Sequence, residues 1–306
     1  MLVWLACGGA TTKPTTPVIP TPGQPTGTTS ASSFPQFQHV AIVVLENQEY
    51  SDVVGSASMP YLNSLMAQGS LATNYFANTH PSLPNYFMLT VGDTVALTDF
   101  FTGTVSEDNV VRRLVAAGAS WRSYLQSLPS VGYLGGDTGA YVKHHDPFSY
   151  LSDVVNSPAQ AANLVPLSAL SSDLAAGQLP RYAFIVPDDE HNSHNCPTGM
   201  TTCTNADKLA AADGFLHDTI GPLLANSAFQ SSGLLIVVFD EALLTDFTNG
   251  GGHVALVLAG TGVKAGFQST TFYQHQSTLR LMLEVLGVTS YPGAAASAPE
   301  MREFFP

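Results

Sequence analysis

The chain has 306 residues, of which 45% are hydrophobic and 11% are charged, and this composition predicts a folded protein and excludes a disordered one. With 23 acidic and 10 basic residues the formal net charge is −13, so repulsion from phosphate backbones argues against nucleic acid as the main partner. No apolar run reaches the ~18 residues that a membrane-spanning helix needs.

The first ten residues, MLVWLACGGA, form a short apolar run that ends in a small residue, a cysteine and two glycines. This pattern is typical of the end of a bacterial lipoprotein signal with Cys7 as the lipidated residue, and the alternative is a disordered N-terminal tag. Residues 11–33 are rich in Pro, Thr, Gly and Ser and predict an extended spacer. We therefore expect a leader remnant and linker over 1–33, a folded domain over 34–306, and export to the periplasm or the cell exterior with Cys7 as a lipid anchor.

Four apolar runs rich in β-branched residues predict buried strands, at 39–45, 181–187, 234–239 and 253–259. Helical patterns lie between and after them, at 59–69, 108–118, 205–227 and 276–287, with Asp108 and Ser277 as caps and glycines as stops. This alternation predicts an α/β sandwich with a mostly parallel central sheet.

Two cysteines, Cys196 and Cys203, bracket the short segment PTGMTT. Export would permit a disulfide that closes this loop. Two free thiols or a metal pair are the alternatives, but the usual short Cys-x-x-Cys spacing is missing. We predict a disulfide.

Acidic and amide side chains follow three of the predicted strands. Glu46 and Asn47 follow the first, Asp188 follows the second, and Asp240 and Glu241 follow the third. In a parallel sheet these positions share the carboxyl edge, where open α/β folds bind ligands. The alternative is that each is an ordinary polar loop. We predict a shared metal site.

The stretch NTHPSLPNYF, residues 78–87, places Ser82 between Pro81 and Pro84 and sets Asn85 three residues further on. Proline fixes its own φ and restricts the preceding residue, so the backbone around Ser82 is stiff. Either Ser82 caps a helix that begins near Pro84, or the stiff turn presents its hydroxyl as a nucleophile. In the second case, free N–H groups at the helix start would also face a bound anion.

Several motifs occur in a familiar order: VVLENQEYSDV, NTHPSLPNYF, YVKHHDPFSY, PDDEHNSHN, VVFDEA, GGHV and YQHQSTLRLMLEVLG. Together they resemble the phosphoesterase family, which contains bacterial phospholipases C and acid phosphatases and belongs to the alkaline phosphatase superfamily. The resemblance runs from about Val40 to Gly287. It implies a three-layer α/β/α sandwich with a metal at the carboxyl edge of a mostly parallel sheet, and 34–306 as the catalytic domain.

The resemblance also implies roles for individual residues. The metal ligands would be Glu46, Asn47, Asp240 and Glu241, together with the nucleophile Ser82. This all-oxygen set favours one essential Mg²⁺, Ca²⁺ or Mn²⁺ ion.

Further site residues come from the same motifs. Asn85 would donate to a phosphoryl oxygen, and His145 and His253 match family histidines. A looser match offers a second metal, such as zinc or iron, or phosphate contacts at Asp188, His191 and His194. His144 would replace His145 if the register moved by one residue. His80 receives no role, and His275 would only orient the helix that follows it.

Three functions are compatible with these residues. The leading hypothesis is an exported, acid-phosphatase-like phosphomonoesterase that passes through a phosphoserine at Ser82 and acts on a phosphorylated small molecule or a phospholipid. The second is a phosphodiesterase or phospholipase C with the same centre, for which the segment FFTG, 100–103, is a candidate apolar rim. The third is a non-catalytic, surface-anchored binding protein.

Overall fold

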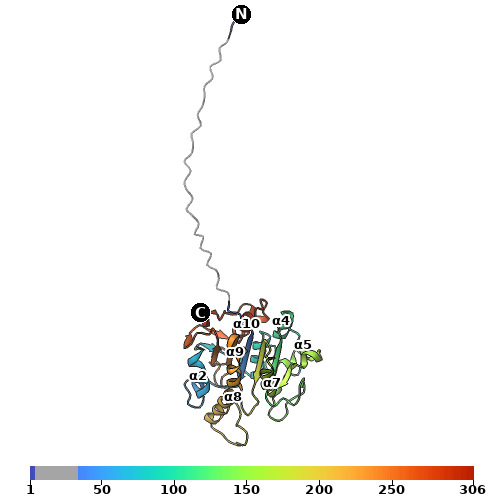
Figure 1. The fold of residues 1–306 in the computed structure, drawn as a ribbon, viewed down its shortest axis with the longest axis vertical. Helices are drawn as coiled ribbons and strands as arrows, with labels where there is room; N and C mark the ends of the chain where they lie inside the picture. The colour runs from blue at the N-terminus through green and yellow to red at the C-terminus, as the bar shows by residue number, and fades with distance from the viewer. Residues whose placement is uncertain (4–33) are drawn as a thin grey trace. The chain divides into compact units, whose positions relative to one another are not determined.

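The computed structural model of the protein describes residues 1–3 and 34–306 (Figure 1). Residues 34–306 form one unit, and a separate unit ends at Ser33. Apart from residues 1–3, the predicted leader and linker, with the predicted anchor Cys7, lie outside the described residues. In the described part of the chain, no helix combines the length and apolar composition that crossing a bilayer requires.

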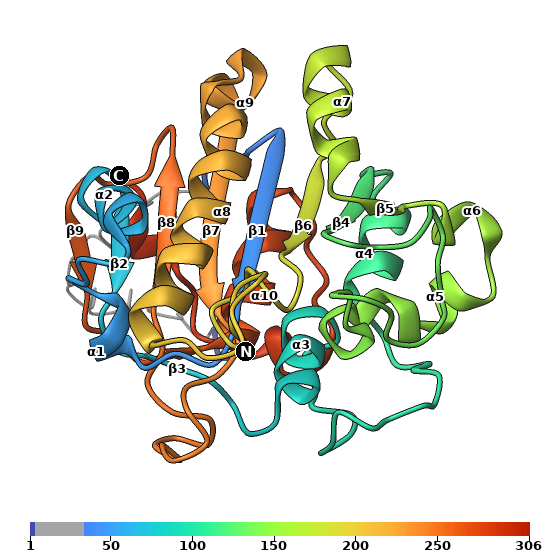
Figure 2. The same cartoon turned by 90° about the horizontal axis from the view of Figure 1, so that it is seen from below.

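The unit 34–306 is built on an eight-stranded sheet with the order β5-β4-β6-β1-β7-β8-β2-β9, which Figure 2 shows side by side. Its strands are β1 (His39–Leu45), β2 (Ser70–Ala72), β4 (Trp121–Leu125), β5 (Leu164–Pro166), β6 (Tyr182–Val186), β7 (Gly233–Phe239), β8 (Leu256–Gly260) and β9 (Phe267–Ser269). A second sheet pairs β3 (Tyr75–Phe76) with β10 (Tyr273–Gln274).

Five neighbouring strands, from β5 to β7 in that order, are parallel, so the prediction of a mostly parallel sheet is confirmed. The run 253–259 is an exception, because β8 begins at Leu256 and is antiparallel to both β7 and β2. All but the last residue of β8 are buried. A continuous apolar run therefore indicates burial on both faces of a strand, and it does not determine the direction of that strand.

Ten α-helices and four short 3₁₀ helices connect the strands of the described unit. The α-helices are α1 (Tyr50–Val53), α2 (Pro60–Gln68), α3 (Ser82–Thr90), α4 (Val110–Ala116), α5 (Ser152–Val155), α6 (Pro158–Ala161), α7 (Ser168–Ala176), α8 (Asn205–Ala225), α9 (Ser227–Ser232) and α10 (His275–Val285). The 3₁₀ helices are Lys143–His145, Pro147–Tyr150, Gly293–Ala296 and Arg302–Phe304. All four predicted helices are present, as α2, α4, α8 and α10.

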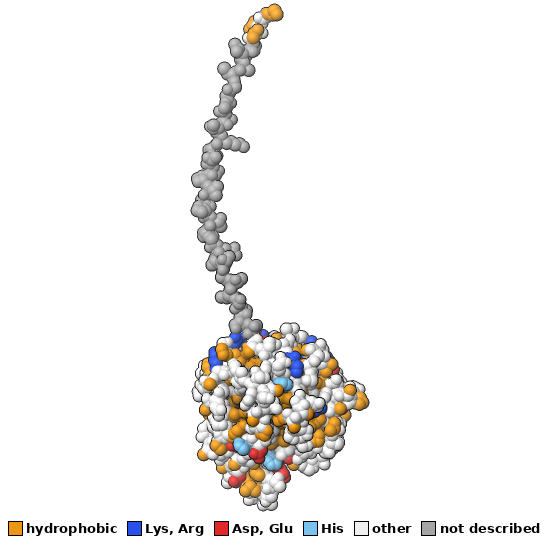
Figure 3. All heavy atoms as spheres, viewed as in Figure 1, with side chains coloured by type: hydrophobic (Ala, Val, Ile, Leu, Met, Phe, Trp, Pro, Cys, Tyr) orange, Lys and Arg blue, Asp and Glu red, His pale blue; other side chains and the backbone are white. Residues whose placement is uncertain are grey.

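The helices form two layers around the sheet. α2 packs against α8, whereas α3 and α4 pack against α10. Figure 2 shows α8 on the near side of the sheet and α10 on the far side. The central strands β1 and β7 are almost entirely buried between these layers. On the face that Figure 3 shows, few side chains are charged, in agreement with the low charged fraction of the chain.

Two predicted helix caps are wrong. Asn109, and not Asp108, caps α4, because its side chain accepts a hydrogen bond from the first turn. Ser277 lies inside α10, which begins two residues earlier at His275. The predicted stop of α2 at Gly69 agrees with the structure.

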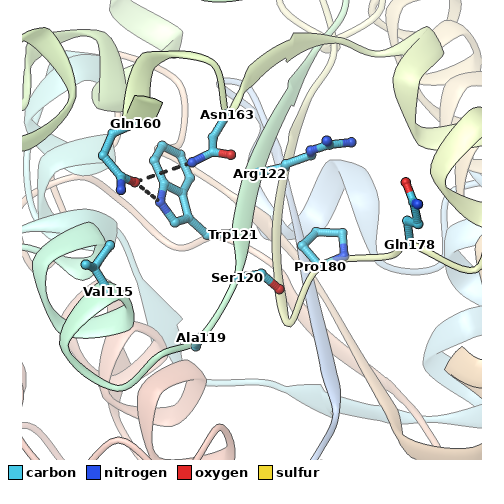
Figure 4. Close-up of a pocket in the computed structure, with 9 residues that line it drawn as sticks. All are labelled: Val115, Ala119, Ser120, Trp121, Arg122, Gln160, Asn163, Gln178 and Pro180. Carbon is cyan, nitrogen blue, oxygen red and sulfur yellow. Dashed lines mark hydrogen bonds between the residues drawn. The ribbon is translucent and has the colours of Figure 1, made fainter. Parts of the chain in front are cut away.

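A surface cavity of about 330 Å³ lies at the amino end of β4, the end opposite to the predicted site (Figure 4). Trp121 Nε1 donates to Gln160 Oε1 at 2.8 Å, and Asn163 Nδ2 donates to the same oxygen at 3.3 Å. These bonds tie β4 to the segment around α6. The polar groups of this cavity thus join elements of the fold.

The N-terminus of α2 is capped by a residue that is distant in the sequence. No side chain of its own N-cap residue, Met59, accepts a hydrogen bond. Instead, the buried carboxylate of Asp213 on α8 accepts from the backbone N–H of Tyr61 at 2.9 Å and of Leu62 at 2.8 Å. This carboxylate links the two helices of one layer.

We expect Asp213→Ala to lower the free energy of unfolding by about 1–3 kcal/mol, because two N–H groups of α2 would lose their acceptor. Urea unfolding measures this change. Asp218→Ala, which removes a carboxylate that is 82% exposed on the same helix, is the control and should change stability by less than ~0.5 kcal/mol. Equal effects of the two variants would contradict the capping role.

Candidate active site

Four of the predicted ligands follow the two adjacent central strands at the carboxyl edge of the sheet. Glu46 and Asn47 follow β1, Asp240 and Glu241 follow β7, and the two strands pair in parallel up to their last residues. All four residues are buried. Asn47 Nδ2 donates to Glu241 Oε1 at 2.7 Å, and the backbone N–H of Asn47 donates to Asp240 Oδ1 at 3.1 Å. The structure thus brings these residues together, and we call Glu46, Asp240 and Glu241 the carboxylate cluster.

Ser82 is the first residue of α3 and is only 5% exposed. Its Oγ lies 3.1 Å from Glu46 Oε2 and 3.1 Å from Glu241 Oε1. The N-cap residue of α3 is Pro81, without a capping side chain. The interpretation of Ser82 as the cap of a helix that begins near Pro84 is therefore wrong. The hydroxyl faces the carboxylate cluster.

The first turn of α3 is not entirely open to an anion. The backbone N–H of Leu83 donates to Asp99 Oδ1 at 2.8 Å. Asp99 comes from the loop that follows α3, and its negative charge complements the positive end of the helix. This N–H is thus occupied, contrary to the expectation of free donors at the helix start.

The amide of Asn85 holds the turn in front of Ser82. Its Oδ1 accepts from the backbone N–H of Asn78 at 3.0 Å and of Thr79 at 3.2 Å. Its Nδ2 donates to the carbonyls of Thr79 at 2.7 Å and of Pro81 at 3.1 Å. The side chain is fully buried. Because both N–H bonds of this amide are used within the loop, the structure corrects the expectation of a donor to a phosphoryl oxygen.

Burial of three neighbouring carboxyl groups makes their ionisation unfavourable. Burial raises the pKa of Glu46 to about 8, and the charge of Glu241 adds to this effect, although the Tyr86 hydroxyl donates to Glu46 Oε1 and opposes it. Burial also raises the pKa of Asp240 well above its usual range, with contributions from Glu46 and Glu241. A cation among these groups would remove much of the penalty.

The donor set fits a hard divalent cation. In the described part of the chain, no three His, Cys, Asp or Glu side chains are arranged so that they could hold a metal ion by themselves. The predicted ligand set also includes oxygens of Asn47 and Ser82. Asn47 Oδ1 and Asp240 Oδ2 are buried and have no hydrogen-bond partner among the described residues. Unpartnered oxygens beside carboxylates are the ligands that Mg²⁺, Ca²⁺ or Mn²⁺ prefers.

His80, to which the sequence assigned no role, contacts the cluster directly. Its Nδ1 lies 2.6 Å from Glu241 Oε2 and its Nε2 lies 2.9 Å from the carbonyl oxygen of Asp246. The carbonyl oxygen of Asp246 only accepts, so Nε2 donates to it, and Nδ1 shares one proton with the Glu241 carboxyl group. Burial lowers the pKa of His80, but the bonds to Glu241 and Asp246 outweigh it, and the pKa is raised.

Tyr86 is a second contact that the sequence interpretation missed. It donates to Glu46 from one helical turn beyond Ser82. Residues four apart on a helix share a face, so the Ser82–Tyr86 spacing was a usable signal.

His145 lies in the site, as expected. It is 4% exposed, its Nε2 is 3.4 Å from Glu46 Oε2, and its ring stacks on that of Tyr86. Burial lowers the pKa of His145 well below its usual range. The neutral ring can therefore bind a phosphoryl oxygen or exchange a proton with a ligand.

The loop after β6 lines the pocket with Asp189 and His194, and not with Asp188 and His191. Asp188 Oδ1 lies 2.6 Å from His191 Nδ1, and Asp188 Oδ2 accepts from Ser127 at 2.6 Å. This pair does not line the pocket, whereas Asp189 and His194 do. The geometry thus separates Asp188 and His191 from His194, which were expected to act together.

Two other histidines have structural surroundings. His253 stacks between Tyr50 at 4.2 Å and Phe76 at 4.8 Å and does not line the pocket of Ser82, contrary to expectation. His275 Nε2 lies 2.6 Å from the carbonyl oxygen of Asp240. It therefore supports the chain beside the cluster and does more than orient α10.

Ser82, Asn47 and Glu241 line a pocket of about 290 Å³. In Figure 2, β1 and β7 point towards the edge of the view where α3 lies, and the pocket is at this edge. Its lining is Asn47, Pro81, Ser82, Asp99, Val142, His144, His145, Asp189, His194, Asn195, Glu241 and Leu244.

A disulfide joins Cys196 to Cys203, just after the pocket residue Asn195, with a Cα–Cα distance of 5.5 Å. The predicted disulfide is therefore confirmed.

Known proteins resemble this chain over most of its length. A phosphatidylinositol-3-phosphatase of Mycobacterium tuberculosis is 29% identical over 90% of the chain and 85% of its own length. A protein of Kluyveromyces lactis named "Probable acid phosphatase" is 32% identical over 79% of the chain, which spans only 56% of that relative.

The fold also matches solved structures. A protein of the alkaline phosphatase superfamily from Vibrio parahaemolyticus superposes with a TM-score of 0.60 and 13% identity, over 89% of this chain and 74% of that one. The predicted alkaline-phosphatase-like fold is therefore confirmed. The model of the Phosphoesterase family matches residues 55–289. The chain thus belongs to the Phosphoesterase family, as its motifs predicted, and its enzyme class is that of a phosphoric ester hydrolase.

Proposed function

We propose that the protein is a divalent-metal-dependent phosphomonoesterase that transfers the phosphoryl group of its substrate to Ser82. The observation that carries this proposal is the position of Ser82 Oγ in the pocket, 3.1 Å from each of two carboxylates, Glu46 and Glu241, that follow different strands. A hydroxyl held rigidly beside bases is the arrangement that a serine nucleophile requires.

The chain's own residues would divide the work as follows. The hydroxyl proton passes to Glu46 Oε2 or Glu241 Oε1 as Ser82 Oγ attacks phosphorus, opposite the leaving oxygen. The new bond joins phosphorus to Oγ, and the bond from phosphorus to the leaving oxygen breaks. A water molecule gives a proton to that oxygen, and the hydroxide that remains hydrolyses the phosphoserine. The rings of His145 and His194 line the pocket and can donate hydrogen bonds to the phosphoryl oxygens. Asn85 holds the turn and His80 holds Glu241.

A divalent ion held by Glu46, Asn47, Asp240 and Glu241 would offset the buried negative charge and lower the pKa of the serine hydroxyl. Asp188, His191 and His194 remain candidates for a second ion or for phosphate contacts. Of these only His194 borders the pocket, which favours a single ion.

Export is part of the same proposal. The disulfide Cys196–Cys203 suits an oxidising compartment. The names of the mycobacterial and yeast relatives support hydrolysis of phosphate monoesters, including that of a phosphorylated lipid. Lipidation of Cys7 remains a prediction. The alternative function is that of a non-catalytic binding protein, and measured hydrolysis of a phosphate ester would exclude it.

A second candidate activity, that of a phosphodiesterase or phospholipase C, is favoured by apolar side chains near the pocket mouth. Phe100 is 91% exposed and Leu97 70% on the loop that contains Asp99, and Phe247 is 67% exposed and Leu244 60% on the loop after β7. Exposed apolar side chains on loops beside a pocket are candidates for contact with a lipid substrate.

Rates with p-nitrophenyl phosphate, bis-p-nitrophenyl phosphate and phosphatidylcholine vesicles separate the two activities. We expect the monoester to be hydrolysed with the highest kcat/KM, because Ser82 and a phosphoserine intermediate serve monoesters directly. Faster release of phosphocholine from the vesicles would favour the second activity.

We expect Ser82→Ala to lower kcat/KM for p-nitrophenyl phosphate by at least about 10³-fold, because the nucleophile is lost. Ser171→Ala, on the surface of α7, is the control and should keep full activity. Acid quenching during turnover should trap phosphate on Ser82, detected by peptide mass. Activity of the Ser82→Ala variant close to that of the wild type would refute the nucleophile.

Stability of the metal-free protein should fall as the pH rises. The pKa of Glu46 rises from 4.5 to about 8 on folding, so the folded state binds this proton more tightly than the unfolded state does. The stabilisation is complete below about pH 4.5 and is lost as the pH approaches about 8. Excess Mg²⁺ should restore stability, most strongly at the high end of this pH range.

Melting temperatures of the EDTA-treated protein across this pH range measure the effect. The Glu46→Gln variant should lose less stability as the pH rises, since it lacks one of the titrating groups. A melting temperature that rises with pH and does not respond to Mg²⁺ would contradict the proposed metal site.

A further inference from the structure

The chain at the end of β1 extends beyond the pairing of this strand with β6. The register between these two strands ends at Val43 and Ile185, whereas β1 pairs with β7 up to Leu45. On the β6 side, the loop after β6 continues the hydrogen bonding, because the backbone N–H of Glu46 donates to the carbonyl of Asn192 at 2.9 Å. Figure 2 shows this loop near the end of β1. The loop thus contacts the chain at the first of the predicted metal ligands.

A side chain of the same loop holds the peptide group between Glu46 and Asn47. Ser193 Oγ donates to the carbonyl oxygen of Glu46 at 2.7 Å, and the carbonyl oxygen of Asn192 is a second acceptor close to this hydroxyl. The N–H at the other end of the peptide group donates to Asp240 Oδ1 at 3.1 Å. Ser193 is buried. Both polar atoms of this peptide group are therefore fixed, and the group links two of the predicted metal ligands.

The orientation of this peptide group determines where the Asn47 side chain points. Asn47 has a φ of 39°, in the left-handed region that few residues other than glycine adopt. In this conformation its Nδ2 donates to Glu241, and its Oδ1 has no hydrogen-bond partner among the described residues. A rotated peptide group would break the bond to Asp240 and move the Asn47 amide away from the carboxylate cluster. The Ser193 hydroxyl thus stabilises the orientation that the predicted ligand set needs.

Ser193 makes this contact from an unfavourable conformation of its own. Its φ is 80°, which is sterically unfavourable for a residue with a Cβ. The side-chain amide of Gln48 donates to the carbonyl of Ser193 at 2.8 Å, and the backbone N–H of His194 donates to Asn192 Oδ1 at 2.9 Å. These bonds hold the loop on both sides of Ser193. The next residue, His194, lines the pocket, so the same turn also sets its place.

We infer that Ser193 is a positioning residue of the metal centre: its hydroxyl fixes the peptide group that joins Glu46 to Asn47 and thereby places both side chains for a divalent cation. Ser193 does not itself line the pocket and acts through these two residues. This inference rests on the proposed function and adds to the site a residue outside the pocket. Groups that orient metal ligands in this way typically change metal affinity or activity by about 10–100-fold.

Two substitutions separate the hydroxyl from the backbone strain. Ser193→Ala removes the hydroxyl and keeps the strain, whereas Ser193→Gly removes the hydroxyl and relieves the strain. Titration of the chelator-treated protein with Mn²⁺, followed by electron paramagnetic resonance, measures the Kd of the ion in the absence of substrate. We expect both substitutions to raise this Kd at least about tenfold, because the peptide group between the two ligands loses its donor. The melting temperature of the metal-free Ser193→Gly variant should nevertheless exceed that of the metal-free Ser193→Ala variant.

Ser70→Ala is the matched control. Ser70 is buried and its hydroxyl donates to the carbonyl of Lys264 at 2.5 Å, but neither residue lines the pocket. This variant loses a comparable hydrogen bond and should keep the Kd of the wild type for Mn²⁺.

The outcomes are distinct. A wild-type Kd in both Ser193 variants overturns the inference, and so does a Kd that Ser70→Ala raises equally. A Kd that is raised in only one of the two Ser193 variants assigns the effect to the backbone conformation and also overturns it. In each of these cases, metal-dependent hydrolysis of p-nitrophenyl phosphate by the wild type keeps the proposed function. Absence of Mn²⁺ binding by the wild type overturns both proposals.

Discussion

The structure depends on holding three carboxyl groups together without exposure to water. Glu46, Asp240 and Glu241 lie at the ends of the two most central strands, and each is at most 1% exposed. Such burial is strongly unfavourable for ionised groups that lack compensation. Hydrogen bonds from Tyr86 and Ser82 provide part of this compensation, and the proposed ion would provide the rest.

The environment of Ser82 follows from the same constraint. The turn before it is fixed by the amide of Asn85, and the first turn of its helix is fixed by Asp99. The proposed nucleophile is thus held from both sides by groups that take no part in the proposed reaction. His80 joins this support to the loop after β7 through Glu241 and Asp246.

Much of the fold could be predicted because local patterns report burial. Continuous apolar runs predicted the central strands, and the polar residues directly after them predicted the candidate site. The direction of β8 could not be predicted, because an apolar run is the same whichever way its neighbours run. Contacts between distant segments, such as Asp213 with the start of α2, are likewise absent from local patterns. The position of His80 two residues before Ser82 suggested that it lies near the candidate site. Its partner Glu241 is 161 residues away in the sequence, so only the fold shows this contact. The motif match predicted His253 as a site residue, whereas its ring stacks between Tyr50 and Phe76. A motif match carries no information about which neighbours stack on a ring.

The presence of a cation at the carboxylate cluster is the claim on which the chemistry depends. Crystals grown with Mn²⁺ and measured near the manganese absorption edge test it most directly. We predict an anomalous density peak in contact with oxygens of Glu46, Asp240 and Glu241 and with Ser82 Oγ. A well-ordered site without such a peak, or a peak bound elsewhere, would contradict the account.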